Sequence, residues 1–167
     1  MKEAMGGTWL TGLVIVFIFL FAGFLAYSIS YTKAFRVKNE ILNLIERNEG
    51  FTNSANDLNN ITDDALKNDS SVEGKAFAYI KSMGYNYSVF DGTNDPCASN
   101  NIGEKQKGGY CLIKYCPKAG ESEKVYYKVT TFIALSIPII NVTVKLPISG
   151  ETKALYYDVS TFKCTNG

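Results

Sequence analysis

The stretch that decides the fold is "WLTGLVIVFIFLFAGFLAYSI", residues 9–29, which continues into "SYTKAFRVKNEILNLIERNEG", residues 30–50, without a proline. No charged residue lies between Glu3 and Lys33. A helix needs about 20 apolar residues to cross the roughly 30 Å hydrocarbon core of a bilayer. The sequence therefore predicts one membrane-spanning helix at residues 9–29.

The helical pattern does not stop at the end of this apolar run. Phe35, Val37, Ile41 and Ile45 recur at helical spacing and are interleaved with charged side chains. We therefore predict one continuous helix from residue 8 to residue 48, about 60 Å long at 1.5 Å per residue. Gly50 is expected to end it, as a glycine suited to a left-handed C-cap.

Two simpler interpretations of the N-terminus stay open. A cleaved secretory signal has a shorter apolar core of about 7 to 15 residues, and cleavage near Ala26 and Ser28 would place the bulky Tyr27 in the recognition box. A plain membrane anchor followed by a short linker helix is the other. A helix of this length, half apolar and half amphipathic, is longer than the core of a small domain needs. The extra length favours packing against other subunits.

Charge gives conflicting indications of location. The net charge of +1 excludes the broad basic surface of a nucleic-acid binder. Lys33, Arg36 and Lys38 follow the apolar run whereas only Lys2 precedes it, so the positive-inside count places the bulk of the chain in the cytoplasm. We instead expect an extracellular C-terminal domain, because the cysteines and the Tyr-rich strands look exported and long domains translocate despite flanking charge.

Four cysteines, Cys97, Cys111, Cys116 and Cys164, are expected to form two disulfides outside the cytosol. Cys111 and Cys116 are five residues apart, so on one strand they point to opposite faces and should not pair. The preferred pairs are Cys97 with Cys111 and Cys116 with Cys164, and the other two pairings remain open. A zinc site is disfavoured by this spacing and by the absence of histidine.

The chain is expected to comprise a short leader at residues 1–7, the long helix at 8–50, a polar linker at 51–73 and a disulfide-stabilised β-domain at 74–167. Ser70 and Glu73 form a capping-box pattern that predicts a short helix at about 72–83. Apolar and polar residues alternate over 125–137 and 142–148, which predicts two antiparallel strands. With "GYCLIKYC", "NYSVF" and a last strand in "KALYYDVSTFKC", the fold class is α+β with a four- to five-stranded antiparallel sheet.

Two prolines and one apolar connection affect the predicted course of these strands. Pro138 should mark a bend, and Pro147 a strand end or an edge strand. The connection "FIALSIPIIN", residues 132–141, is nearly all apolar where a hairpin tip is usually polar. It either folds under the sheet as core or projects to touch the membrane surface or a partner subunit.

The sequence offers little for catalysis. Without histidine there is no histidine general base and no Ser-His-Asp or Cys-His arrangement. The "SGETK" and "GEKQKGG" segments lack the spacing and context of a phosphate-binding loop. We expect no enzymatic activity, no catalytic residue, no cofactor and no metal.

The segment "GGTWLTGLVIVFIFLFAGFLAYSISYTKAFRVKNEI", residues 6–41, resembles the N-terminus of type IV pilin-like proteins, and most closely the TadE-like minor pseudopilins of bacterial tight-adherence pili. It covers about a quarter of the chain. The resemblance implies a membrane-anchored structural subunit of a surface pilus or secretion machine, with leader cleavage after Gly6 or Gly7. Thr11 or Gly12 stands where such a mature chain has a glutamate, so the usual filament register is not implied.

Assembly with other pilin-like subunits, or with itself, would use the long helix. Small residues let helices approach closely in the apolar phase. The residues expected to mediate assembly are Gly12, Ala22, Gly23, Ala26, Phe35, Ile41 and Ile45. The alternative function is a signal-anchored extracellular ligand-binding domain, with a contact surface made of Tyr110, Tyr126, Tyr127, Tyr156 and Tyr157.

Overall fold

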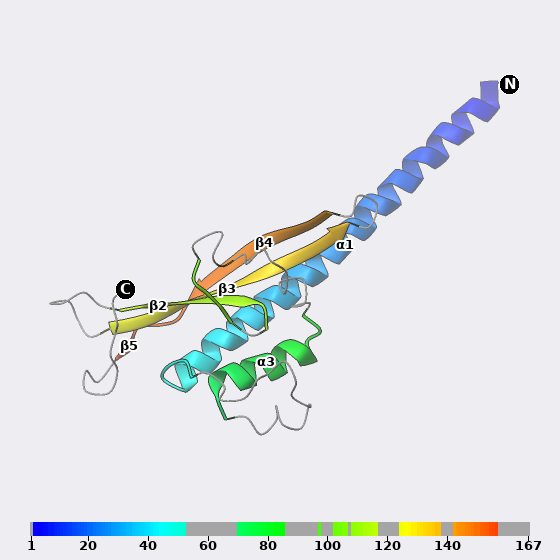
Figure 1. Cartoon of the computed structure of the whole chain (residues 1–167). Helices are drawn as coiled ribbons and strands as arrows, with labels where there is room; N and C mark the ends of the chain where they lie inside the picture. The colour runs from blue at the N-terminus through cyan, green and yellow to red at the C-terminus, as the bar shows by residue number, and fades with distance from the viewer. Residues whose placement is uncertain are drawn as a thin grey trace.

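The computed structural model describes residues 2–52, 70–85, 97, 102–106, 108–116, 124–137 and 142–156. Within these residues, two helices and one antiparallel sheet form an α+β fold, which confirms the predicted fold class (Figure 1). The elements are α1 (Lys2–Arg47), α3 (Val72–Ser82), β1 (Glu104–Gln106), β2 (Tyr110–Tyr115), β3 (Lys124–Ile137), β4 (Val142–Glu151) and β5 (Leu155–Tyr156).

Helix α1 is unbroken over 46 residues, about 70 Å at 1.5 Å per residue. It starts earlier than predicted, so the described part of the predicted leader is helical. Figure 1 shows its N-terminal half projecting alone from the rest of the molecule. The C-terminal half lies along the sheet, so one helix forms both the projecting segment and part of the folded domain.

The end of α1 differs from the prediction. Gly50 N–H donates to the Ile45 carbonyl at 3.0 Å and Glu49 N–H to the Glu46 carbonyl at 3.4 Å, the two bonds of a Schellman motif. Glu49, with φ 53°, occupies the left-handed position that was assigned to Gly50. Gly50 follows with φ 155°, a conformation that also favours glycine.

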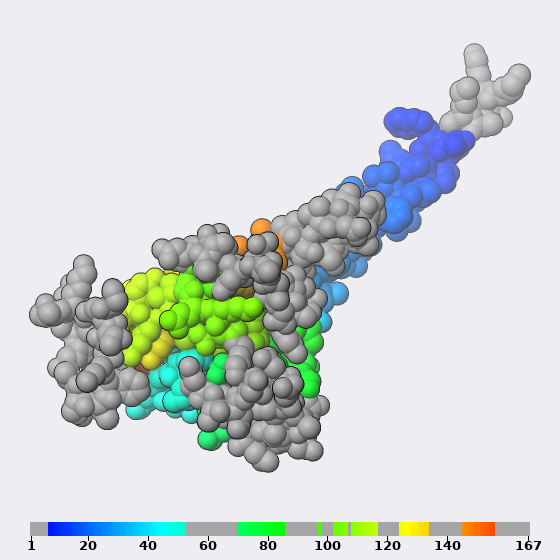
Figure 2. Space-filling view, viewed as in Figure 1, coloured from blue at the N-terminus to red at the C-terminus, as the bar shows by residue number. Residues whose placement is uncertain are grey.

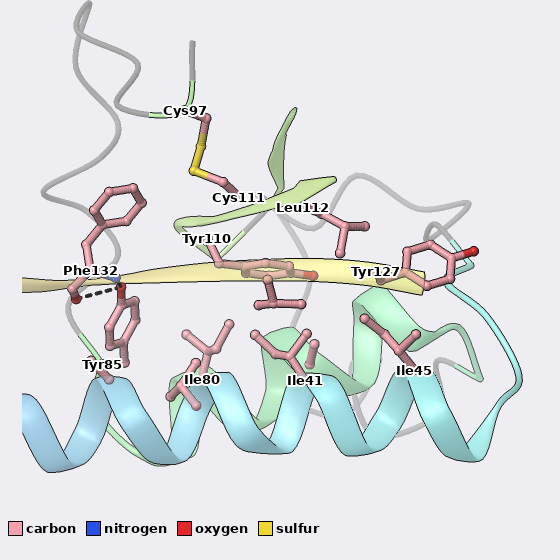
Figure 3. Packing of buried hydrophobic residues seen from close by; sticks show 14 of the residues in the cluster. Ile41, Ile45, Ile80, Tyr85, Cys97, Tyr110, Cys111, Leu112, Tyr127 and Phe132 are labelled. Atoms are coloured by element: carbon pink, nitrogen blue, oxygen red, sulfur yellow. Dashed lines mark hydrogen bonds between the residues drawn. A yellow bond between two sulfur atoms is a disulfide. The ribbon is translucent and has the colours of Figure 1, made fainter. Parts of the chain in front are cut away.

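One core holds α1, α3 and the sheet together. Ala34, Val37, Ile41 and Ile45 follow one another at intervals of three or four residues and are fully buried. Figure 3 shows Ile41 and Ile45 pointing from α1 to the sheet, beside Ile80. A hydrogen bond from Thr131 Oγ1 to the Ala34 carbonyl at 3.1 Å fixes β3 on α1 at this level.

Helix α3 is capped by Ser71, whose hydroxyl accepts from Gly74 N–H at 3.0 Å, so the predicted cap at Ser70 is wrong by one residue. Thr52 supports the same end from outside the helix. Its hydroxyl accepts from Val72 N–H at 2.9 Å, and its carbonyl accepts from Glu73 N–H at 3.1 Å. The segment after α1 therefore helps to fix where α3 begins.

The sheet has the strand order β1-β2-β3-β4, with β5 paired to the first two residues of β3. Strands β3 and β4 form a hairpin whose register runs from Lys128 opposite Glu151 to Ile137 opposite Val142. Pro147 lies within β4, at the end of this strand order, so the predicted edge strand is confirmed rather than a strand end. Pro138 and the predicted strand in "NYSVF" lie outside the described residues.

Tyr85 completes the sheet just before β2 begins. Its hydroxyl accepts from Phe132 N–H at 3.0 Å and donates to the Phe132 carbonyl at 2.9 Å, with the Gly109 carbonyl at 3.3 Å (Figure 3). The hydroxyl thus takes the place of a peptide group of the next strand. Burial, only partly offset by the Phe132 bond, raises the pKa of Tyr85 to about 12.

Candidate membrane and assembly surface

The N-terminal half of α1 is apolar and bare. Every residue from 7 to 27 is exposed, including large side chains such as Trp9, Phe17 and Phe21. The helix is long and apolar enough to cross a membrane, and no part of its most apolar segment is buried within the described structure. So large an apolar surface needs lipid or protein to cover it.

An aromatic ladder marks the point where the apolar half meets the charged half. Tyr27, Tyr31 and Phe35 are spaced four residues apart, with ring centroids at 6.3 Å and 6.1 Å. Lys38 Nζ lies 4.4 Å from the centroid of the Phe35 ring. Tyrosines are typical of the membrane–water interface, so this ladder fits the C-terminal boundary of a membrane span.

The four small residues predicted to mediate assembly are all exposed: Gly12, Ala22, Gly23 and Ala26. A Cβ built on Gly12 or Gly23 would meet nothing within 4 Å. At 100° per residue, Gly12, Gly23 and Ala26 lie within an arc of about 60°. Together they form a narrow face of α1, here called the small face, on which another helix can approach closely.

The amphipathic half gives a different outcome. Phe35 is 39% exposed and remains available to a partner. Ile41 and Ile45 are 0% exposed, because they pack against the sheet of their own chain. The prediction that these two isoleucines mediate assembly is therefore wrong, since their apolar surface is already covered.

A shallow groove of about 420 Å³ lies on the outer side of α1, between Phe35, Asn39 and Tyr79 of α3. It is open to solvent rather than enclosed. Small-molecule sites are usually enclosed and apolar with a few convergent polar groups. The groove therefore gives no specific support to ligand binding.

The tyrosines predicted to form a ligand-contact surface are not gathered on one face. Tyr110 and Tyr127 are buried in the core. Tyr126 is half-buried and stacks on Tyr115 at 4.6 Å. Tyr157 and the Tyr156 side chain lie outside the described structure. For Tyr110 and Tyr127 the contact-surface prediction is wrong, because both rings serve to fill the core.

Cys97 and Cys111 form a disulfide with a Cα–Cα distance of 5.6 Å, as predicted (Figure 3). It lies on the face of β3 away from α1, above Phe132. Cys116 is also disulfide-bonded, and Cys164, its predicted partner, lies outside the described residues. A disulfide of this kind fits an oxidising compartment.

The described part of the chain shows no cluster of three or more potential metal ligands. The groups whose pKa is strongly shifted are tyrosines in the core. Burial first, and then the charge of Glu73, raise the pKa of Tyr110 far above its usual range. Such shifts follow from structural burial and form no constellation of acid, base and nucleophile.

The described residues define an α+β domain that continues into the long, exposed and apolar N-terminal half of α1 (Figure 2). Comparison with protein-family models, with curated proteins and with solved structures finds no match. Any function must therefore be inferred from the geometry of this chain.

Proposed function

We propose that this protein is a membrane-anchored, pseudopilin-like structural subunit of a bacterial surface pilus or secretion machine. The observation that carries the proposal is the continuity of α1. One rigid helix presents a bare apolar half and packs its other half into the domain core. Such a subunit can leave or enter a bundle of helices without changing its own fold.

The domain lies on the extracytoplasmic side in this proposal, as an extracellular part that is incorporated in a cell-surface filament. The Cys97–Cys111 disulfide supports this side of the membrane. The positive charges that opposed it are partly engaged by the domain. Lys33 Nζ donates to the Gly84 carbonyl at 3.4 Å, and Lys38 of α1 is buried beside Phe35 of the same helix and Gly150 of β4.

Partners are other pilin-like subunits or further copies of this chain, which contact the small face of α1. Gly12, Gly23 and Ala26 define this face, and Phe19 lies on it at 100° per residue. Phe21 lies on the opposite face and is likewise exposed. These two phenylalanines, two residues apart, provide a matched pair for testing which face meets a partner.

The test places a photoreactive phenylalanine analogue at position 19 or at position 21 of the full chain in its native membrane. Crosslinked multimers or crosslinks to a pilin-like partner are expected from position 19 and not from position 21. Equal crosslinking at both positions would indicate random collision. Only monomers at both positions would contradict assembly through α1 and favour a simple anchor.

A further inference from the structure

The β3–β4 hairpin lies along α1 and points toward the apolar half of the helix (Figure 1). Two contacts define this direction. A Cβ on Gly150 of β4 would lie 2.9 Å from Leu42 and 3.0 Å from Lys38. Further along the hairpin, Thr131 is bonded to Ala34, and its register partner is Ile148. Advancing toward the hairpin end is therefore advancing toward the N-terminus of α1.

The hairpin reaches past Ile29, the C-terminal end of the predicted membrane span, and so overlaps the level of the span. From Thr131 to the end of β3 at Ile137 is six residues, about 20 Å at 3.4 Å per residue. From Ala34 back to Ile29 is five residues of helix, about 7.5 Å. Even at 45° to α1, β3 would advance about 14 Å along the helix axis, past the level of Ile29.

The composition of the hairpin end fits this level. We define the hairpin end as residues 134–137 and 142–146, which carry a single charge, at Lys145. The remainder are aliphatic residues, with Ser136 and Thr143 as the polar exceptions. Leu146, near its base, is 40% exposed. A strand pair in water usually carries more charge on its exposed side.

We propose that the hairpin end is a second membrane contact, which enters the interfacial layer of the bilayer beside α1. The aromatic ladder places the interface near Tyr27 and Tyr31, the level that the hairpin end reaches. Apolar elements lying in this layer are buried by about 5–10 Å. This depth matches the distance by which β3 passes the level of Ile29. The protein is thus held at two points, so the domain has a fixed tilt on the membrane. This inference rests on α1 crossing the bilayer and does not depend on assembly.

The test uses tryptophan quenching by brominated phospholipids in nanodiscs that hold the full chain. Trp9 is the single native tryptophan, so Trp9→Phe provides a background without tryptophan. Ile137→Trp and Val142→Trp report from the two strands of the hairpin end. Lys153→Trp is the control, because Lys153 is exposed at the opposite end of the hairpin.

Lipids brominated near the headgroup end of their chains should quench the tryptophans introduced at positions 137 and 142 at least about twofold, with little effect on the one at position 153. Two reporters guard against one substitution disturbing the hairpin, and each variant must keep the thermal transition of its background. Quenching of native Trp9 without quenching at either hairpin position would overturn the inference and leave the anchor intact. A blue-shifted but unquenched hairpin tryptophan that depends on protein density would also overturn it, by showing contact with a second copy. Absence of Trp9 quenching would refute the membrane span itself, and the hairpin contact with it.

Discussion

Two buried tyrosines should respond in opposite ways to the same substitution. Tyr85→Phe removes a hydroxyl that bonds both Phe132 N–H and the Phe132 carbonyl. Tyr110→Phe removes a buried hydroxyl that bonds no described residue. The two variants lose the same atom from the same core, so the difference between them isolates the hydrogen bonds.

The magnitude follows from what each substitution leaves behind. Without the Tyr85 hydroxyl, the buried Phe132 N–H and carbonyl lose the two hydrogen bonds that it makes just before the start of β2. Removing a hydrogen bond from a buried polar group costs about 1–3 kcal/mol, so the loss of two bonds should lower the free energy of unfolding by roughly 2–6 kcal/mol. Tyr110→Phe should be neutral or stabilising by up to about 1 kcal/mol, because an unpaired hydroxyl leaves the core.

Thermal unfolding of the full chain in detergent at pH 7, followed by near-UV circular dichroism with the disulfides oxidised, measures this difference. At about 3–5 °C per kcal/mol for a domain of this size, the two variants should differ in Tm by about 6 °C or more. A Tyr85→Phe variant as stable as Tyr110→Phe would refute the view that the Tyr85 hydroxyl replaces a missing strand partner.

Three further outcomes test other parts of the fold. Glu49→Gly should raise the free energy of unfolding by about 1 kcal/mol, because glycine adopts the left-handed conformation without strain, whereas Asn48→Gly should bring no gain in chemical denaturation. Ile41→Ala should cost about 2–5 kcal/mol because it leaves a cavity in the core, while Phe35→Ala should cost about 1 kcal/mol, and equal losses would contradict the assignment of the two faces. Stability should fall as the pH rises from about 10 toward 12 in a pH titration of unfolding, since unfolded tyrosines ionise near 10 whereas the pKa of Tyr85 is raised to about 12, and Tyr85→Phe should flatten this slope.

The sequence was sufficient for the elements whose signal is local. The apolar run and the spacing of Ala34, Val37, Ile41 and Ile45 lie within a few turns of one another, so α1 could be predicted as continuous. Alternation over residues 125–133 likewise indicated one buried face, and Val125 and Val129 lie on it. These patterns depend on backbone periodicity alone.

Features set by distant residues could not be predicted. Ser70 and Ser71 both precede α3, and the choice of Ser71 as the cap goes with bonds from Thr52, about twenty residues earlier. Periodicity shows that Ile41 and Ile45 need cover, but not whether the cover is their own sheet or a neighbour. The same ambiguity applied to Tyr110 and Tyr127, whose place in the core depends on the pairing of β2 and β3.

Assembly and the hairpin contact compete for one space, which gives a last prediction. At 100° per residue, the small face at Gly12 and Gly23 is in line with Ala34, Val37 and Ile41, the side on which the sheet packs. A neighbouring helix on this face therefore lies beneath the hairpin end and displaces lipid from it. In the Ile137→Trp variant, multimers crosslinked through position 19 should show weaker lipid quenching of the introduced tryptophan than monomers in the same nanodiscs, with the Lys153→Trp control unchanged. Equal quenching in both would mean that neighbours bind α1 on another side.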